Sequence, residues 1–183
     1  MTETTNPSAL RSQKEITDAL ITLMKKYPYS EITVKQIILE ARLAGKTFYR
    51  NFTSKDDVLM SLIKCILLDY FSIVNNAESD VLTTIFSFAE TNRELLSLLD
   101  KNDMLYLPMQ YMNESIPYIG SNQNKEMNPF VKLFDGLESD YLIAMNTGAV
   151  WNVISLWIHR GMTDDTAYVR DNIRKYIRRI SDM

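Results

Sequence analysis

The chain has 183 residues, of which 46% are hydrophobic and 23% are charged, a composition typical of an ordinary globular protein with one domain or two small ones. It contains only five glycines and five prolines. Because turns between strands depend on these residues, their scarcity favours long helices over a β-rich fold. A single cysteine cannot form an internal disulfide, so a reducing, cytoplasmic setting is expected. The N-terminus has no basic region followed by an apolar one, so no secretory signal peptide is expected.

The net charge of −3 argues by itself against a nucleic-acid-binding protein. The distribution of charge changes this interpretation. Residues 1–55 contain nine Lys and Arg against five Asp and Glu, whereas the remainder contains eleven basic and eighteen acidic residues. Such asymmetry indicates a basic N-terminal part that faces DNA and an acidic body.

The N-terminal part is predicted to form three helices. Apolar residues recur at three- and four-residue spacing through 9–26, which predicts the first helix, and Pro28 prevents its continuation. Thr33 and Gln36 have the spacing of a capping box, which starts a second, short helix. A third, also short, is predicted from about residue 44 to residue 50.

The rest of the chain also shows helical patterns, so the expected fold class is all-α. The further helices are predicted at about 55–75, 80–90, 92–101, 104–116, 130–160 and 164–180. Ser54 and Asp164 are the expected caps of the first and last of these, and 120–126 is expected to be a polar loop. The expected organisation is a three-helix domain at 8–54 followed by a helical domain at 55–183.

Short helices joined by tight turns are sufficient for a helix-turn-helix, whose second helix enters the major groove of DNA. Here that helix is 44–50. Phe48 lies four residues from both Ala44 and Phe52 and is expected to point inward, which turns the other side chains toward phosphates and base edges. The helix starts at Thr33 and Lys55 are expected to bind phosphates through free backbone N–H groups. The predicted DNA-contacting residues are Thr33, Val34, Lys35, Arg42, Ala44, Gly45, Lys46, Thr47, Tyr49, Arg50 and Lys55.

The run from Ile32 to Ile37, then Ala41, and the run from Lys46 to Leu59 together resemble the N-terminal domain of the tetracycline-repressor (TetR) family. The resemblance covers roughly residues 10–60. It implies a homodimer whose helical body binds a small-molecule effector, and repression of transcription that the effector relieves. It also implies DNA contacts by the residues that commonly make them in the family, namely Thr33, Lys46, Thr47, Tyr49 and Lys55.

Two positions depart from the family pattern. Arg42 occupies a turn position often held by glycine, and Ala44 replaces the usual serine cap, a change that costs about 1 kcal/mol. These departures keep open an alternative, a helical co-regulator that acts through a protein partner instead of binding DNA itself. An enzyme is disfavoured because the residue types of a catalytic site are missing. One histidine and one cysteine do not make a usual zinc site, and no cofactor is expected.

The two C-terminal helices resemble the dimer-forming pair of the family. Gly148 and Ala149 permit close approach of a second helix. The expected interface residues are Gly148, Ile154, Trp157, Ile158, Tyr168, Ile173, Tyr176 and Ile177. The segments 148–154 and 157–162 are also weakly similar to regulators of dihydroxyacetone-kinase operons.

An effector site is expected to be concave and mostly apolar, with a few polar groups. The candidate residues are Phe71, Phe86, Met104, Tyr106, Met109, Tyr111, Met112, Phe134, Tyr141, Met145 and Asn152. Each of these is also compatible with an ordinary core position. Cys65 is expected to be a small buried hydrophobe, and His159 to complement the dipole at the end of its helix. The uncharged stretch 141–158 is interrupted by polar residues and is interpreted as a buried helix, so no membrane contact is expected.

Overall fold

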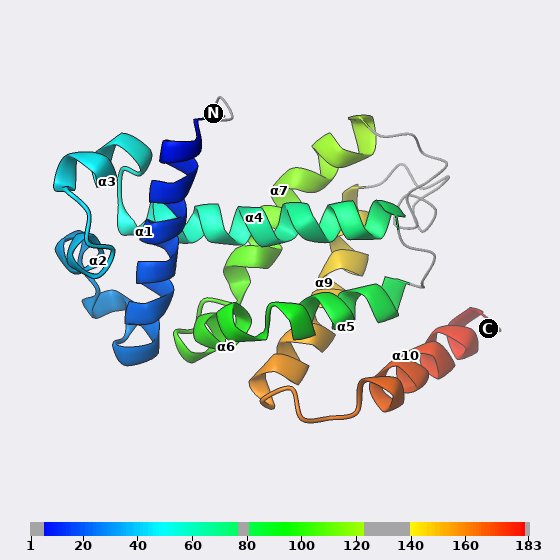
Figure 1. Cartoon of the computed structure of the whole chain (residues 1–183). Coiled ribbons are helices and arrows are strands. Elements are labelled where there is room, and N and C mark those ends of the chain that lie inside the picture. Colours follow the sequence, from blue (N-terminus) through cyan, green and yellow to red (C-terminus); the bar gives the residue numbers. More distant parts are fainter. Residues whose placement is uncertain (1–5, 77–80, 123–139, 182–183) are drawn as a thin grey trace. The chain divides into compact units, whose positions relative to one another are not determined.

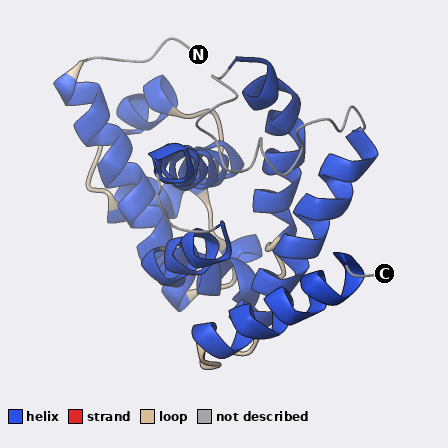
Figure 2. Ribbon diagram, turned by 90° about the vertical axis from the view of Figure 1, so that its right-hand side faces the viewer, coloured by secondary structure: helices blue, strands red, loops and turns tan. Residues whose placement is uncertain are grey.

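A computed structural model describes residues 6–76, 81–122 and 140–181 of the chain (Figure 1). These residues form helices joined by turns, and no strand occurs among them (Figure 2). The prediction of an all-α fold is therefore confirmed. The chain divides into two compact units, Met1–Ile66 and Leu67–Met183, which we call the head and the body. The fourth helix contributes residues to both.

The head contains α1 (Pro7–Lys26), the short 3-10 helix η1 (Tyr29–Glu31), α2 (Val34–Glu40), α3 (Gly45–Asn51) and the first part of α4 (Lys55–Asn76). Asn6 caps α1, because its side-chain oxygen accepts a hydrogen bond of 3.0 Å from the backbone N–H of Ser8. Pro7 follows at the first helical position, where its missing N–H is not needed.

The start of α2 is the capping box that the sequence predicts. The Thr33 hydroxyl accepts a hydrogen bond from the Gln36 backbone N–H at 3.3 Å, and the Thr33 N–H donates to Gln36 Oε1 at 2.8 Å. Both groups at the helix start are thereby satisfied, so the first turn of α2 is fixed by local interactions.

The core of the head lies where α1 packs against α2 and α3. Ile16, Leu20, Met24, Ile37 and Phe48 are each fully buried. Burial of one such side chain stabilises the fold by roughly 1.5–3 kcal/mol. The short helices α2 and α3 therefore depend on packing against α1, because isolated helices of this length are unstable in water.

The body contains α5 (Val81–Thr91), α6 (Arg93–Lys101), α7 (Tyr106–Asn122), α9 (Asp140–His159) and α10 (Thr166–Ser181). Helix α9 packs against α6 and α7, and α10 packs against α5. Helix α7 passes Pro117 and ends at Asn122, beyond the end predicted near 116. The loss of one backbone donor at Pro117 does not end a helix that is held against α9. Of the helix predicted at 130–160, the part before Asp140 lies outside the described residues.

A fixed corner joins α9 to α10. Gly161 and Met162 have positive φ angles of 74° and 56°, and the Arg93 guanidinium donates to both of their carbonyl oxygens at 3.2 and 3.1 Å. The Trp157 indole N–H donates to the Asp164 carbonyl at 3.0 Å. Asp164 was the expected cap of the last helix. Instead, the carboxylate of the next residue, Asp165, accepts from the N–H of Ala167 at 2.9 Å.

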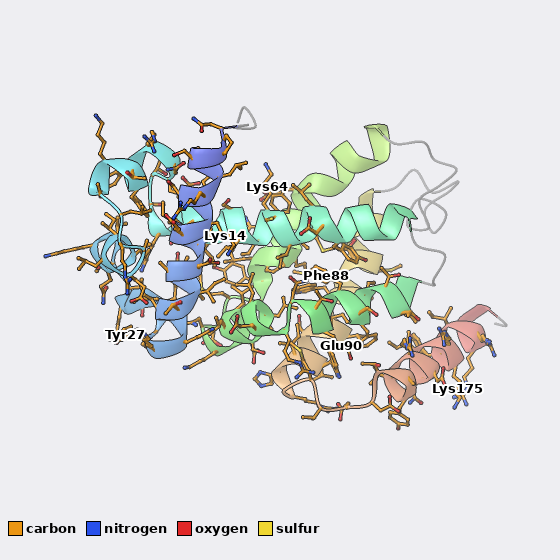
Figure 3. All side chains as sticks on the ribbon, viewed as in Figure 1. Lys14, Tyr27, Lys64, Phe88, Glu90 and Lys175 are labelled. Atoms are coloured by element: carbon orange, nitrogen blue, oxygen red, sulfur yellow. The ribbon has the colours of Figure 1, made fainter. Side chains whose placement is uncertain are left out.

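Two expectations concern apolar segments. The uncharged stretch within α9 is partly buried in the body, as at Trp151 and Trp157, and no helix in the described ranges has the length and hydropathy needed to cross a membrane. The expectation that Cys65 is buried is wrong, because its side chain is exposed on α4. It follows Lys64, which Figure 3 labels, in the sequence. An apolar run of residues does not by itself say which of them face outward.

Candidate functional site

The helix α3 has one buried face and one exposed face. Phe48 is fully buried, and its ring packs against those of Tyr49 and Phe52 at centroid distances of 5.3 and 6.2 Å. Tyr49 is 64% exposed, and Lys46 and Arg50 are also exposed. The predicted orientation of this helix is confirmed. Two cations and a phenol hydroxyl lie on its outer face, which is a suitable set of donors for a phosphate backbone.

The start of α3 is open to an approaching molecule. Ala44 occupies the cap position and forms no side-chain cap hydrogen bond, as its apolar side chain predicts. A Cβ atom built on Gly45 would have its nearest neighbour at 3.9 Å, the Ile38 side chain, which is an ordinary contact distance. The packing of the head therefore does not require glycine here. Its small size instead leaves room for a surface from outside, and Thr47, half-buried, lies two residues further along the helix.

Arg42 lies in the turn between α2 and α3 and has a φ of 55°. This left-handed conformation costs a residue with a Cβ roughly 1–2 kcal/mol, so the turn is strained at the position where the family pattern often has glycine. The Arg42 backbone N–H donates to the Leu39 carbonyl at 3.1 Å, which closes the turn. The Arg42 side chain is exposed and adds a third cation near the start of α3.

The start of α2 carries the other group of predicted contacts. Thr33 and Lys35 are exposed, and Val34 is half-buried. The Thr33 hydroxyl donates to Gln36 Oε1 at 2.7 Å in addition to its role as a cap. It can still accept a hydrogen bond, but its proton is already used within the chain.

Lys55 differs from the other predicted DNA contacts. Its ammonium group donates to the backbone carbonyls of Tyr29 at 2.8 Å and Ile32 at 2.9 Å. The same nitrogen lies 4.5 Å from the centre of the Tyr29 ring, within the range of a cation–π interaction. Sequence reasoning missed this arrangement, because backbone carbonyls are acceptors that every residue carries.

Tyr29 is itself buried and tied to the start of α4. Its hydroxyl donates to the Asp56 carboxylate. Burial, followed by the hydrogen bond and the charge of Asp56, raises the pKa of Tyr29 far above its usual value. Tyr29 therefore stays neutral and keeps its proton on this hydrogen bond.

The body contains a small apolar cavity of about 30 Å³. It is lined by residues of α4, α5, α7 and α9, namely Leu67, Tyr70, Ile85, Phe88, Met112, Thr147, Val150, Trp151 and Ile154. The Trp151 indole N–H is engaged with the Leu105 carbonyl at 3.0 Å and does not point a free donor into this space. A cavity of this size has room for a water molecule or two, and typical ligand pockets are at least about 300 Å³.

The predicted effector residues lie in several places. Met112 lines the cavity. Phe86 is buried against Trp157, with ring centroids 5.2 Å apart, and belongs to the core. Tyr106, Met145 and Asn152 are exposed, whereas Met104, Met109 and Tyr111 are half-buried without lining the cavity. Phe134 and the side chains of Phe71 and Tyr141 lie outside the described residues.

The predicted dimer residues fall into two groups. Ile154, Trp157 and Ile158 are buried within the body and support α9 from the inside. Tyr168, Tyr176 and Ile177 of α10 are more than half exposed, and Gly148 and Ile173 are half-buried. A Cβ built on Gly148 would meet nothing within 4 Å. The exposed face of α9 carries Met145, Ala149, Asn152 and Leu156, of which the sequence prediction of the interface considered only Ala149.

Comparison with known proteins supports the family resemblance. Residues 16–62 match the model of the bacterial regulatory proteins of the tetR family. Three similar solved structures span almost the whole chain. A TetR transcriptional regulator from Streptococcus agalactiae 2603V has a TM-score of 0.61 at 18% identity and covers 92% of each chain. The fatty acid degradation regulator FadR from Bacillus halodurans has a TM-score of 0.56 at 19% identity, covering 92% of this chain and 94% of that one.

The third is the dihydroxyacetone kinase operon activator DhaS, with a TM-score of 0.52 at 20% identity, covering 91% of this chain and 94% of that one. No curated protein matches the sequence. A helix-turn-helix with an exposed basic face on its second helix, in a segment that matches bacterial regulatory proteins, is typical of DNA-binding transcriptional regulators. The N-terminal part of the chain, residues 16–62, thus matches the DNA-binding domain of the tetR family, as its motif predicted, and the chain as a whole shares the fold of the three solved structures.

Proposed function

We propose that the chain is a homodimeric repressor that binds a specific operator through α3 and the start of α2, and that a small, mainly apolar effector releases it. The observation that carries the DNA-binding part is the outer face of α3. There Lys46, Tyr49 and Arg50 are exposed around the fully buried Phe48.

In this proposal the contacts divide into two kinds. Lys46, Tyr49 and the first-turn N–H groups of α2 bind phosphates, which positions the head but carries little sequence information. Arg50, Thr47 and Lys35 read base edges, where arginine or lysine pairs with guanine and threonine meets the thymine methyl group. Gly45 lets the backbone of α3 approach the groove closely.

The test is a gel shift with the DNA upstream of the protein's own gene, compared with a scrambled duplex over a range of salt concentrations. Specific binding should weaken steeply with salt. Lys46→Met should weaken it, and Lys175→Met is the matched control, because Lys175 is an exposed lysine on α10 (Figure 3). If neither duplex is bound at low salt, the proposal of direct DNA binding fails, and the co-regulator alternative takes its place.

The homodimer is proposed to form through α9 and α10. A two-fold operator is read by two heads, so a monomer is not sufficient. The exposed apolar side chains of α10 and the unfilled space at Gly148 support this choice. A partner helix can approach α9 closely at Gly148, because no side chain or other helix among the described residues lies within 4 Å of a Cβ built there.

The effector is proposed to bind by enlarging the cavity in the body. Its lining is almost entirely aliphatic, aromatic or thioether, with the Thr147 and Tyr70 side chains as its polar groups. These residues fit a hydrocarbon or aromatic body with at most one or two polar groups better than a sugar or a charged metabolite. The name of one structural neighbour, a fatty acid degradation regulator, is compatible with this class.

Two measurements test the effector proposal. Medium-chain alcohols and simple aromatics should raise Tm and release DNA, whereas sugars should do neither. Val150→Phe fills the cavity and should abolish both effects while DNA binding persists. Val150→Ile is the matched control that adds a single methylene. Retained ligand response in Val150→Phe would exclude this cavity as the site.

The direction of control and the compartment are also proposals. The family resemblance favours repression in the bacterial cytoplasm, whereas one structural neighbour is an operon activator. A reporter gene placed behind the upstream DNA distinguishes the two. Deletion of the protein's gene should raise expression of the reporter if it is a repressor and lower it if it is an activator.

A further inference from the structure

Lys55 occupies a position that is unfavourable for a cation. It is the first residue of α4, and the N-terminal end of a helix carries partial positive charge, which favours anions. The next two residues, Asp56 and Asp57, follow that preference. The presence of lysine at the first position therefore calls for another interaction that compensates for the dipole.

The contacts of the ammonium group supply that interaction. An ammonium has three hydrogens and no acceptor. The Lys55 Nζ atom lies 2.8 Å from the Tyr29 carbonyl, 2.9 Å from the Ile32 carbonyl and 3.4 Å from the Ser30 carbonyl. Each hydrogen thus has an acceptor within the head, and the Tyr29 ring covers one side of the nitrogen. A phosphate would have to displace these partners.

The segment that Lys55 holds leads directly into α2. Ile32 is buried and precedes Thr33, whose carbonyl accepts the hydrogen bond of 3.2 Å from the Ile37 N–H. The Tyr29 hydroxyl returns to Asp56 at the start of α4. Two side chains therefore connect the start of α4 with the segment 29–32 that precedes α2. Lys55 reaches from α4 to the segment, and Tyr29 reaches from the segment to α4.

We propose that Lys55 is a positioning residue: its ammonium fixes the Tyr29–Ile32 turn on the start of α4 and so holds the first turn of α2 in the orientation that binds DNA. Its side chain does not contact the phosphate backbone. The effect on DNA rests on the proposed function. The role differs from the direct contact that the family resemblance implies for this position.

The salt dependence of DNA affinity separates the two roles. A lysine that neutralises one phosphate contributes about 0.9 to the slope of log K against log salt concentration. The probe is a nonspecific duplex of 20 base pairs. Its Kd is measured at a series of low salt concentrations, at a temperature below the Tm of every variant. The wild type is compared with Lys55→Met, and Lys46→Met is the control. Lys46→Met should reduce the slope by about 0.9 at unchanged Tm. Lys55→Met should raise Kd by about tenfold, or about 1.4 kcal/mol, with the slope of the wild type.

The stability of the variants gives a second, independent measurement. Lys55→Met should lower Tm by about 4 °C or more, since charge-assisted hydrogen bonds are lost. Tyr29→Leu keeps every charge and should raise Kd without changing the slope, which maintains the test if Lys55→Met folds poorly. A lower Tm with unchanged Kd of the folded protein would show a purely structural role. An unchanged Tm with a slope reduced as in Lys46→Met would show a phosphate contact. Either result overturns the proposal.

Hydrogen exchange tests the positioning without DNA. In Lys55→Met the amides of Ile32 and Ile37 should exchange faster than in the wild type, while the amide of Phe52 at the end of α3 should be unaffected. If the wild type binds no duplex, the proposed function fails, but this comparison still decides whether Lys55 orders the start of α2. Unchanged protection of Ile32 and Ile37 would reject the role assigned to Lys55.

Discussion

The candidate binding regions of the head and the body differ in polarity: the head has an exposed polar face, and the body has an apolar cavity. In the head, the outer face of α3 presents exposed cations and a tyrosine around a single buried ring, and local hydrogen bonds fix the starts of α1 and α2. In the body, the cavity is lined almost entirely by apolar side chains and has a volume of only about 30 Å³. The surface of the head is thus present without a ligand, whereas binding of the proposed effector would require a larger space in the body.

This difference indicates how each unit is expected to bind. A pre-formed surface needs little reorganisation, so its affinity is set by charge and by the number of contacts. A small apolar cavity that took up the proposed effector would exchange packing contacts for ligand contacts, and a conformational change would then be part of binding. An effector-controlled regulator needs such a change, because an effector that leaves the conformation of the protein unchanged does not alter its DNA affinity.

The largest expected effect tests how far the surface of the head depends on its core. Phe48→Ala removes a fully buried ring between α3 and the rest of the head and should lower the free energy of unfolding by roughly 3–5 kcal/mol. Denaturant titration followed by circular dichroism measures this loss. Tyr49→Ala, one residue away and 64% exposed, is the control and should change stability by less than about 1 kcal/mol.

The next effect concerns the outer surface of the body. Gly148→Arg places a long cation where no packing neighbour among the described residues lies within 4 Å of the new Cβ, so the monomer should fold normally. The dimer should be lost, and DNA affinity should fall by about 100-fold or more because the two heads then bind independently. Light scattering measures the mass. Ser97→Arg, at an exposed position of α6, should stay dimeric. An intact Gly148→Arg dimer would refute the placement of the interface.

A smaller effect tests the division of contacts in the head. Tyr49→Phe removes one hydroxyl from an exposed side chain and should weaken binding by about threefold to tenfold, the equivalent of one lost hydrogen bond. Because the proposed partner is a phosphate, the loss should be the same on the upstream DNA and on a scrambled duplex. A loss limited to the upstream DNA would instead assign Tyr49 to base recognition. If Tyr49→Phe bound both duplexes as tightly as the wild type does, Tyr49 would not belong to the contact surface.

The smallest effect tests the strained turn. Arg42→Gly relieves a φ of 55° that is unfavourable for arginine. The relief is partly offset by the greater freedom of glycine in the unfolded chain, so the head should gain about 0.5–1 kcal/mol. Thermal unfolding measures the gain. Arg42→Lys keeps the strain and the charge and should leave Tm unchanged. A lower Tm in Arg42→Gly would mean that the side chain stabilises the turn more than its conformation costs.

Much of the head could be predicted from the sequence, because its features depend on nearby residues. The Thr33–Gln36 box and the inward position of Phe48 follow from spacing along one helix, and both are present. The role of Lys55 could not be predicted in this way. Its acceptors are backbone carbonyls more than twenty residues away in the sequence, and carbonyls leave no signal in the residue types.

In the body, the sequence did not predict which residues are buried and which are exposed, because helices such as α9 are apolar on several sides. In α9, Ile154 and Trp157 are buried while Leu156 is 52% exposed, and periodicity alone does not say which face meets the same chain. The cavity has the same difficulty. Met112 and Phe86 are both large apolar residues on helices, yet one lines the cavity and the other fills the core.

The corner between α9 and α10 has a consequence for how quickly two subunits could join. The Arg93 guanidinium donates hydrogen bonds to the carbonyls of Gly161 and Met162. The Trp157 indole N–H donates to the Asp164 carbonyl. Because this corner fixes α9 and α10 relative to each other before a second copy binds, association would cost little conformational entropy in these helices. Arg93→Ala should therefore slow association of the proposed dimer although the residue is not among the proposed contact residues. Stopped-flow mixing of separated subunits measures that association rate.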